Sequence, residues 1–139
     1  MSDLKAFLKP SVSVITHKIV VSTRFTDDHG KPVPFEIHSI SQAENDALRK
    51  ASTKTKTDKG QRVEIFDAGQ YQARLVVACT AAPDFRSPEM LKAYGAADPL
   101  DVPGKMLLAG EFVNLGAAIL EICGFNEETP EALKEEAKN

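Results

Sequence analysis

The chain has 139 residues and a net charge of −3, and hydrophobic residues make up 42% of it, an ordinary balance for one folded domain. No apolar run reaches the roughly 18 residues of a membrane-spanning helix, and the acidic balance argues against a general nucleic-acid-binding protein. Residues 1–66 hold 11 basic and 8 acidic side chains, whereas residues 67–139 hold 6 and 12. We therefore expect a cytosolic protein whose two halves can attract each other, within or between chains.

Two segments rich in β-branched residues, 11–25 and 33–40, predict the strands of an N-terminal hairpin. Their apolar residues fall on odd positions, so they share a face only if paired residue numbers sum to an even number. A three-residue loop over 28–30 satisfies this condition, with Asp27 opening the turn and Gly30 in the left-handed conformation that glycine adopts easily. The residues expected on the shared inner face are Val21, Phe25, Val33, Phe35 and Ile37.

Capping residues and an apolar spacing of 3.6 predict the helices. Ser41 and Glu44 have the spacing of a capping box, and the stripe of Tyr71, Leu75 and Cys79 predicts a central helix. The expected helical ranges are 3–9, 41 to 51 or 54, 67–82, 88–94 and 111–123, with a marginal helix after Thr129.

The stretch 49–62 contains six basic residues and a single acidic one. Residues 52–61 are expected to form a solvated loop or a mobile hairpin tip, and 62–66 a short strand with Val63 and Ile65 as its buried pair. The stretch lacks the aromatic residues with which single-stranded nucleic acids stack, so the alternative to a solvated loop is a surface that steers an acidic protein partner. The candidates for this role are Lys50, Lys54, Lys56 and Lys59.

The helix predicted over 111–123 is apolar on two sides. Such a helix is either deeply buried or shared with a partner, and the residues alone leave both alternatives open. If its residues are not all used by the core, the best candidate for a partner-binding surface lies on and just before this helix. The candidate residues are Leu108, Phe112, Leu115 and Ile119.

The residues that could carry chemistry form no recognisable site. His17 and His38 are expected on opposite faces of the hairpin and His29 on its turn, and no metal-ligand spacing such as HxH or CxxC occurs. Cys79 and Cys123 are expected to be small core residues. No nucleotide-binding or hydrolase motif is present. We therefore expect no catalytic, cofactor or metal site, and a protein that is not an enzyme.

The predicted fold class is α+β, with an N-terminal antiparallel β-hairpin packed on a bundle of four to five short helices. A third short strand can join the hairpin. We expect residues 1–125 to form a single domain and residues 126–139 to form a weakly helical or disordered tail, because the tail has little apolar surface to bury.

Several blocks of the sequence resemble the XkdN-like phage tail assembly chaperones. The turn DHGKP and the helix start ISQAENDALRK, both within residues 20–50, resemble the family's N-terminal block. The segments YQARL at 71–75, KMLL at 105–108 and GEF at 110–112 are similar to its later blocks. The resemblance covers about residues 4–125, in the order in which the family has these blocks.

This resemblance implies a non-enzymatic assembly factor of a tailed phage or prophage, working in the host cell cytoplasm without a cofactor. Such chaperones are thought to coat the tape measure protein, to help recruit tail tube subunits and to leave before the tail is complete. Many are also made in a longer, frameshifted form. The alternatives are a structural tail or baseplate component that stays in the particle, and a small enzyme with an unrecognised site. The two-sided helix and the opposed charges also lead us to expect weak self-association.

Overall fold

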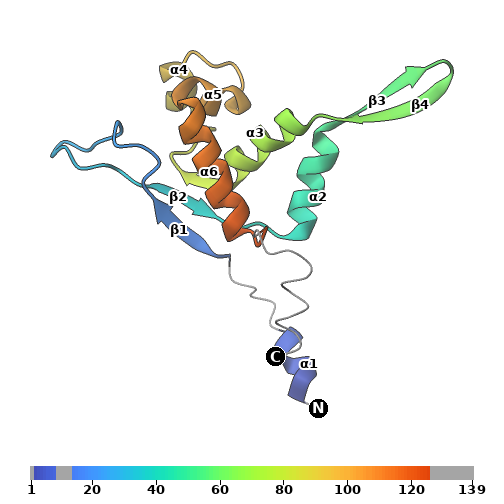
Figure 1. The fold of residues 1–139 in the computed structure, drawn as a ribbon, viewed down its shortest axis with the longest axis horizontal. Helices are drawn as coiled ribbons and strands as arrows, with labels where there is room; N and C mark the ends of the chain where they lie inside the picture. The colour runs from blue at the N-terminus through green and yellow to red at the C-terminus, as the bar shows by residue number, and fades with distance from the viewer. Residues whose placement is uncertain (1, 9–13, 126–139) are drawn as a thin grey trace.

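The computed structural model describes residues 2–8 and 14–125 (Figure 1). It confirms the α+β class and the N-terminal hairpin. The described elements, in chain order, are α1 (Ser2–Phe7), β1 (Thr16–Ile19), β2 (Phe35–His38), α2 (Gln42–Ala51), β3 (Thr53–Asp58), β4 (Gln61–Phe66), α3 (Ala68–Cys79), β5 (Thr80–Ala82), α4 (Pro88–Ala93), the 3-10 helix η1 (Pro99–Asp101), α5 (Val102–Met106) and α6 (Ala109–Ile122). The expected tail, the helix after Thr129 and the first three residues of the expected strand 11–25 lie outside the described residues.

The hairpin turn has the predicted three-residue loop. The Asp27 N–H donates to the Lys31 carbonyl at 2.8 Å, and the Gly30 N–H donates to the Asp27 carbonyl at 3.0 Å. Gly30 has a φ of 76°, which is the left-handed conformation that a Cβ disfavours. The Asp27 carboxylate also accepts the N–H groups of His29 and Lys31, so this residue organises the turn from its first position.

The strands of this hairpin are shorter than expected, and one inner-face residue was assigned wrongly. Phe35 and Ile37 are buried, but Val33 is 45% exposed. Ile19 lies opposite Phe35, and the Val33 N–H donates to the Phe25 carbonyl. Between these two pairings the first side of the hairpin advances six residues and the second side only two. The chain thus leaves the strand ladder after Ile19, and the turn extends beyond the helices (Figure 1). Val33, close to this turn in sequence, is therefore left nearly half exposed.

A third strand completes the N-terminal sheet, in the order β1-β2-β5. This strand falls inside the range that was expected to be helical, because α3 ends at Cys79 and not at residue 82. Thr80 has extended backbone angles, and its hydroxyl donates to the Val76 carbonyl at 2.7 Å, which satisfies one carbonyl at the helix end. Ala82 precedes Pro83, and a residue before proline is biased away from the helical conformation.

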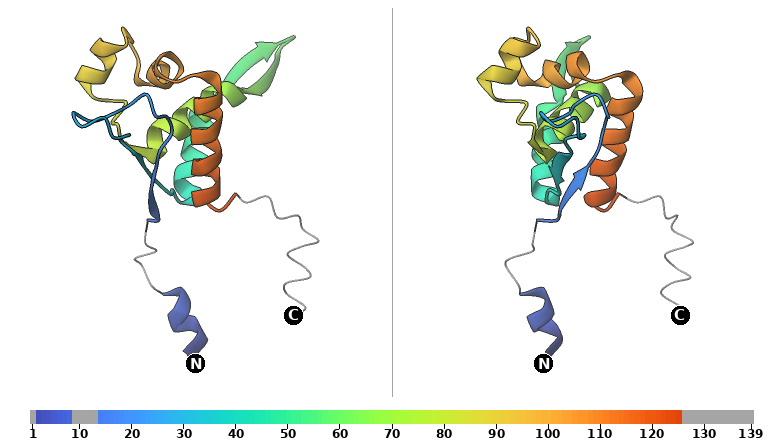
Figure 2. Two further views of the ribbon diagram at one scale, coloured as in Figure 1. Left: turned by 60° about the vertical axis from the view of Figure 1, so that its left-hand side comes forward. Right: turned by 90° about the vertical axis from the view of Figure 1, so that its left-hand side faces the viewer.

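The core lies where α6 crosses α3 and the sheet (Figure 2). Phe35 links the layers, with its ring centroid 5.9 Å from that of Phe25 and 6.5 Å from that of Phe85. Cys79 is fully buried, as predicted, and Cys123 is half-buried beside it. The buried hydrophobic residues are Phe35, Ile37, Leu75, Val76, Val77, Cys79, Phe85, Val102, Met106, Leu107, Leu115, Ile119 and Ile122.

Capping fixes the starts of the two helices that frame the core. At α2 the Glu44 N–H donates to the Ser41 hydroxyl and the Ser41 N–H donates to the Glu44 carboxylate, both at 3.2 Å, so the predicted capping box is confirmed. At α6 the Leu108 N–H donates to the Glu111 carboxylate at 2.8 Å. This contact places the start of α6 two residues before the predicted position.

Candidate partner-binding surface

The β3–β4 hairpin, residues 53–66 and hereafter the arm, is separate from the three-stranded sheet. It extends away from the helices in Figure 1 and in the left view of Figure 2. Every residue from 54 to 66 is exposed. A two-stranded ribbon without a covering layer is marginally stable in water, so a partner that covers the arm would stabilise it.

The arm forms because its sequence alternates and turns tightly. Asp58 pairs with Gln61, which leaves Lys59 and Gly60 as a two-residue loop, and both have positive φ, 52° and 80°. This is the backbone of the turn that best matches the twist of a β-hairpin. The strand predicted over 62–66 is confirmed, and of the two structures expected for 52–61 the hairpin is the one that forms.

One face of the arm combines two apolar residues with two lysines. Lys54 lies opposite Ile65, and Lys56 lies opposite Val63; these four side chains project from the same face, because alternate residues of a strand do so. Val63 is 42% exposed and Ile65 48%. The expectation that they form a buried pair is therefore wrong, since within the described residues the arm packs on no other layer.

The base of the arm is held firmly, in contrast to its tip. The Arg49 guanidinium lies 4.5 Å from the centroid of the Phe66 ring and 5.6 Å from that of the Tyr71 ring. The Asp67 N–H donates to the carbonyl of Ser52 at 2.8 Å, and Ser52 itself is fully buried. Cation–π stacking and this hydrogen bond tie the arm to α2 and α3, so its direction is set by the body of the protein.

The four candidate lysines divide between the arm and α2. Lys54 and Lys56 lie on β3 and Lys59 in the turn, and all three are exposed. Lys50 lies in the last turn of α2, where its ammonium is 3.4 Å from the Asp46 carboxylate and both side chains are exposed. The structure thus brings three of the four together on one projecting element.

The candidate residues near α6 do not form one surface. Leu115 and Ile119 are fully buried, Phe112 is half-buried, and Leu108 is 62% exposed at the start of the helix. The alternative that the sequence left open is therefore answered for the two central residues, which belong to the core. Val113 is exposed on the outer side of α6, but no second exposed large hydrophobic residue of α6 accompanies it.

An ion pair that sequence reasoning missed fastens the N-terminal hairpin to α6. The Arg24 guanidinium donates to the Glu111 carboxylate at 2.5 and 3.3 Å and to the Met106 carbonyl at 3.3 Å. The hydrogen bond from Arg24, with smaller contributions from the Ser22 hydroxyl and the Leu108 N–H, lowers the pKa of Glu111 to about 2. Glu111 follows a glycine at a predicted helix start, but its partner lies 87 residues away and no local pattern identifies it.

The described residues contain no group of three or more His, Cys, Asp and Glu side chains placed to hold a metal ion. His17 lies opposite Ile37, and His38 lies opposite Thr16, so the two histidines face opposite sides of the hairpin, as predicted. None of the helices in ranges 2–8 and 14–125 has the length and hydropathy needed to cross a bilayer.

Comparison with known proteins identifies the family. The sequence profile of the phage XkdN-like tail assembly chaperone proteins matches residues 4–138. The chain is 39% identical over 124 residues to the phage-like element PBSX protein XkdN of Bacillus subtilis strain 168, covering 88% of this chain and 83% of that protein. It is 35% identical over 138 residues to the uncharacterized protein YqbN of the same strain, covering 96% and 92%.

A crystal structure of YqbN has a similar fold. It matches 91% of this chain and 99% of its own with a TM-score of 0.75 at 28% sequence identity. The blocks that resembled the family in sequence thus lie in a chain that matches the family's profile and its relative XkdN. The chain belongs to the family of phage XkdN-like tail assembly chaperones.

Proposed function

We propose that this chain binds the tape measure protein in the host cytoplasm during phage tail assembly and leaves before the particle is complete. It acts by binding alone, without catalysis. Family membership supports the role of tail assembly chaperone. The single observation that supports a client surface is the arm, whose exposed Val63 and Ile65 lie on β4 directly opposite Lys56 and Lys54 on β3.

The chemistry of this face suits an elongated helical client. An unassembled tape measure exposes apolar stripes along its helices, which need temporary cover. One face of the arm offers two apolar side chains on β4 beside two lysines on β3, and lysine stems add further apolar contact while their ammonium groups stay in water. The client segment that fits best therefore carries an apolar stripe with acidic residues beside it.

The lysines of the arm contribute mainly to the rate of encounter. Exposed charges at the edge of an interface raise the association rate, and this effect weakens as salt screens them. Changing Lys54, Lys56 and Lys59 together to Glu should slow association with the client and flatten its salt dependence. The free energy of unfolding should stay close to that of the wild type, since all three side chains are exposed.

Further partners follow from the same role. We propose the tail tube protein, and a longer frameshifted form of this chain where one is made, as additional binding partners. Weak self-association would place several copies along one tape measure, because linked sites raise the effective concentration of each copy. Sedimentation over a range of concentrations measures this, and a monomer at high micromolar concentration contradicts it.

The decisive experiment co-expresses the full chain with the tape measure protein of the same phage and measures co-purification. In the variant Val63→Asp/Ile65→Asp we expect the tape measure to be lost from the purified complex. The matched control Thr55→Asp/Thr57→Asp adds the same two charges to the opposite face of the arm, and it should retain the client. Thermal unfolding must be the same for both variants.

Two outcomes contradict the proposal. If the Val63→Asp/Ile65→Asp variant recovers the tape measure at the wild-type yield, the arm is not the client surface. If mass spectrometry of purified, complete particles finds this chain in a fixed ratio to the tail proteins, it is a structural component of the tail or baseplate. Absence from complete particles, together with presence in assembly intermediates, supports the chaperone role.

A further inference from the structure

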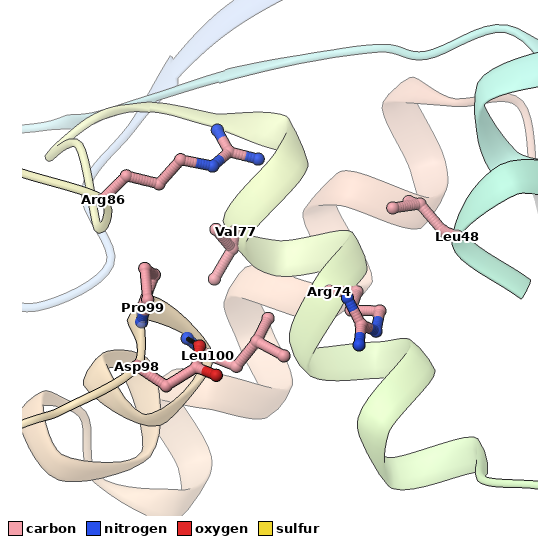
Figure 3. A pocket seen from close by; sticks show the side chains of 7 residues that line it. All are labelled: Leu48, Arg74, Val77, Arg86, Asp98, Pro99 and Leu100. Carbon is pink, nitrogen blue, oxygen red and sulfur yellow. Dashed lines mark hydrogen bonds between the residues drawn. The ribbon is translucent and has the colours of Figure 1, made fainter. Parts of the chain in front are cut away.

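A hollow of about 230 Å³ lies between α2, α3 and the segment that ends in η1. Two arginines reach it, Arg74 from α3 and Arg86 from the loop after β5, with Val77 between them in Figure 3. Leu48, Asp98, Pro99 and Leu100 complete its walls. The hollow therefore combines apolar side chains with two permanent positive charges and one carboxylate, which leaves a net positive charge.

Within residues 2–8 and 14–125 the positive charge of this hollow exceeds the negative charge that lines it. Neither arginine has an ion pair with a described residue, and the buried Nε of Arg74 has no hydrogen-bond partner. The Asp98 carboxylate on the wall of the hollow accepts the Leu100 N–H at 2.9 Å, and its single charge can balance at most one of the two arginines. Buried donors in folded proteins nearly always have a partner, and a guanidinium is best satisfied by a carboxylate.

The chain itself contains a segment of matching chemistry. Residues 1–125 hold 15 basic and 15 acidic side chains, whereas residues 126–139 hold two basic and five acidic. The whole net charge of −3 therefore belongs to the C-terminal segment. Within it Leu133 lies between Glu131 and Glu135, so an apolar side chain and two carboxylates occur together, as the apolar walls and the arginines of the hollow require.

The C-terminal segment also begins close enough to reach the hollow. Phe125 and Asn45 line the same depression at the start of α2, and Leu48, three residues along α2, lines the arginine hollow. Three residues advance about 4.5 Å along a helix, and the six residues from 126 to 131 span up to about 20 Å when extended. A carboxylate at residue 131 can thus enter the hollow of its own chain.

We propose that the hollow between Arg74 and Arg86 is a carboxylate-binding site that holds the acidic C-terminal segment, residues 126–139, of the same chain. The arm is the competing basic surface, but its lysines are exposed, and exposed ion pairs are weak because water and salt screen them. In the hollow Arg86 is also exposed, but Arg74 is half-buried beside apolar side chains, where a charge-assisted hydrogen bond is stronger.

A tryptophan probe tests this site in the full chain, which has no tryptophan of its own. In the variant Leu133→Trp we expect emission at shorter wavelength and weaker quenching by acrylamide than for a free tryptophan, because residue 133 lies against the apolar walls. Adding Arg74→Gln/Arg86→Gln should abolish both effects. The matched control Lys59→Gln/Arg62→Gln removes two positive charges from the arm instead and should leave both effects intact.

Two further measurements separate binding of the C-terminal segment from effects on folding and from association between chains. Adding Glu131→Gln/Glu135→Gln to the probe variant changes only the C-terminal segment and should also abolish the blue shift. Dilution should leave the emission unchanged, because the site is filled within one chain. The proposal is overturned if Leu133→Trp emits like a fully exposed tryptophan or if Lys59→Gln/Arg62→Gln abolishes the blue shift. It is also overturned if the shift persists in Glu131→Gln/Glu135→Gln or disappears on dilution.

Discussion

Helix α6 and the arm both carry apolar residues at regular spacing, yet the fold uses them in opposite ways. In α6 the sheet and α3 cover Leu115 and Ile119 completely, whereas in the arm Val63 and Ile65 remain nearly half exposed. The difference arises from the layers available: a helix that crosses both a sheet and another helix is buried, while a two-stranded ribbon beyond the helices has nothing to pack on. Regularly spaced apolar residues thus indicate a face that is stabilised by burial. Whether another element of the same chain buries that face depends on the tertiary fold.

The largest expected effect is the loss of unfolding free energy when a buried residue of α6 is truncated. Leu115→Ala removes a fully buried side chain and should lower the free energy of unfolding by about 2–5 kcal/mol. The matched change Val113→Ala, at an exposed site of the same helix, should change it by less than about 0.5 kcal/mol. Denaturant unfolding measures both. Equal effects would show that α6 is not the core helix described here.

The next largest effect is a difference in stability between alanine variants of the two hairpin turns. Gly30 and Gly60 both have positive φ, 76° and 80°, so an alanine in either turn is strained by about 1 kcal/mol. Gly30→Ala should lower the global free energy of unfolding by about this amount, because its hairpin continues into the core sheet. Gly60→Ala should leave global stability unchanged and speed amide exchange only within the arm. A global loss with Gly60→Ala would mean that the arm unfolds together with the core.

The Arg24–Glu111 pair predicts a dependence of stability on pH. The pKa of Glu111 is lowered from 4.5 to about 2 in the folded protein, so its stabilising contribution is complete above pH 4.5 and disappears as the pH falls toward 2. Glu111→Gln should therefore lose less stability than the wild type across this range. Glu121→Gln, exposed on the same helix, is the control and should follow the wild-type curve.

The smallest effect concerns Cys79, at the end of α3, and Cys123, at the end of α6. Burial, with the neighbouring Cys123 thiol, raises the pKa of Cys79 to about 12. Because the thiolate is the reactive form, iodoacetamide should modify Cys79 of the folded chain at pH 8 only as fast as the protein unfolds. Peptide mass spectrometry follows this reaction, and rapid modification without denaturant would show that the contact between α3 and α6 opens readily.

Local chemistry predicted the parts of the fold that depend on neighbouring residues. The three-residue turn with Gly30 and the capping box of Ser41 and Glu44 rest on short-range hydrogen bonds, and both are confirmed. The exposure of Val33 and the pairing of Arg24 with Glu111 depend on segments far apart in the sequence. A single sequence contains no signal for such contacts, because many arrangements satisfy the same local pattern. At Thr80 the proline after Ala82 is a local signal that the helix ends early, but the pairing of this segment with β2 is a distant contact.

In the candidate surface, too, only part of what the structure shows could be predicted from the sequence. The lysines of the arm were identified from charge alone, since charged residues remain exposed in almost any fold. For Leu115 and Ile119 the sequence left core and partner surface open, and both belong to the core, whereas Val63 and Ile65, which were expected to be buried, are exposed. Apolar character cannot distinguish a core from an interface, because the same burial of surface drives folding and association.

Amide hydrogen exchange with and without the tape measure protein compares the two regions most directly. In the free chain the amides of α6 should exchange far more slowly than those of the arm, because the arm's hydrogen bonds are open to solvent. On adding the tape measure, the arm amides should become protected while those of α6 stay as they were. Protection gained along α6, with an arm that exchanges as fast as before, would contradict the account.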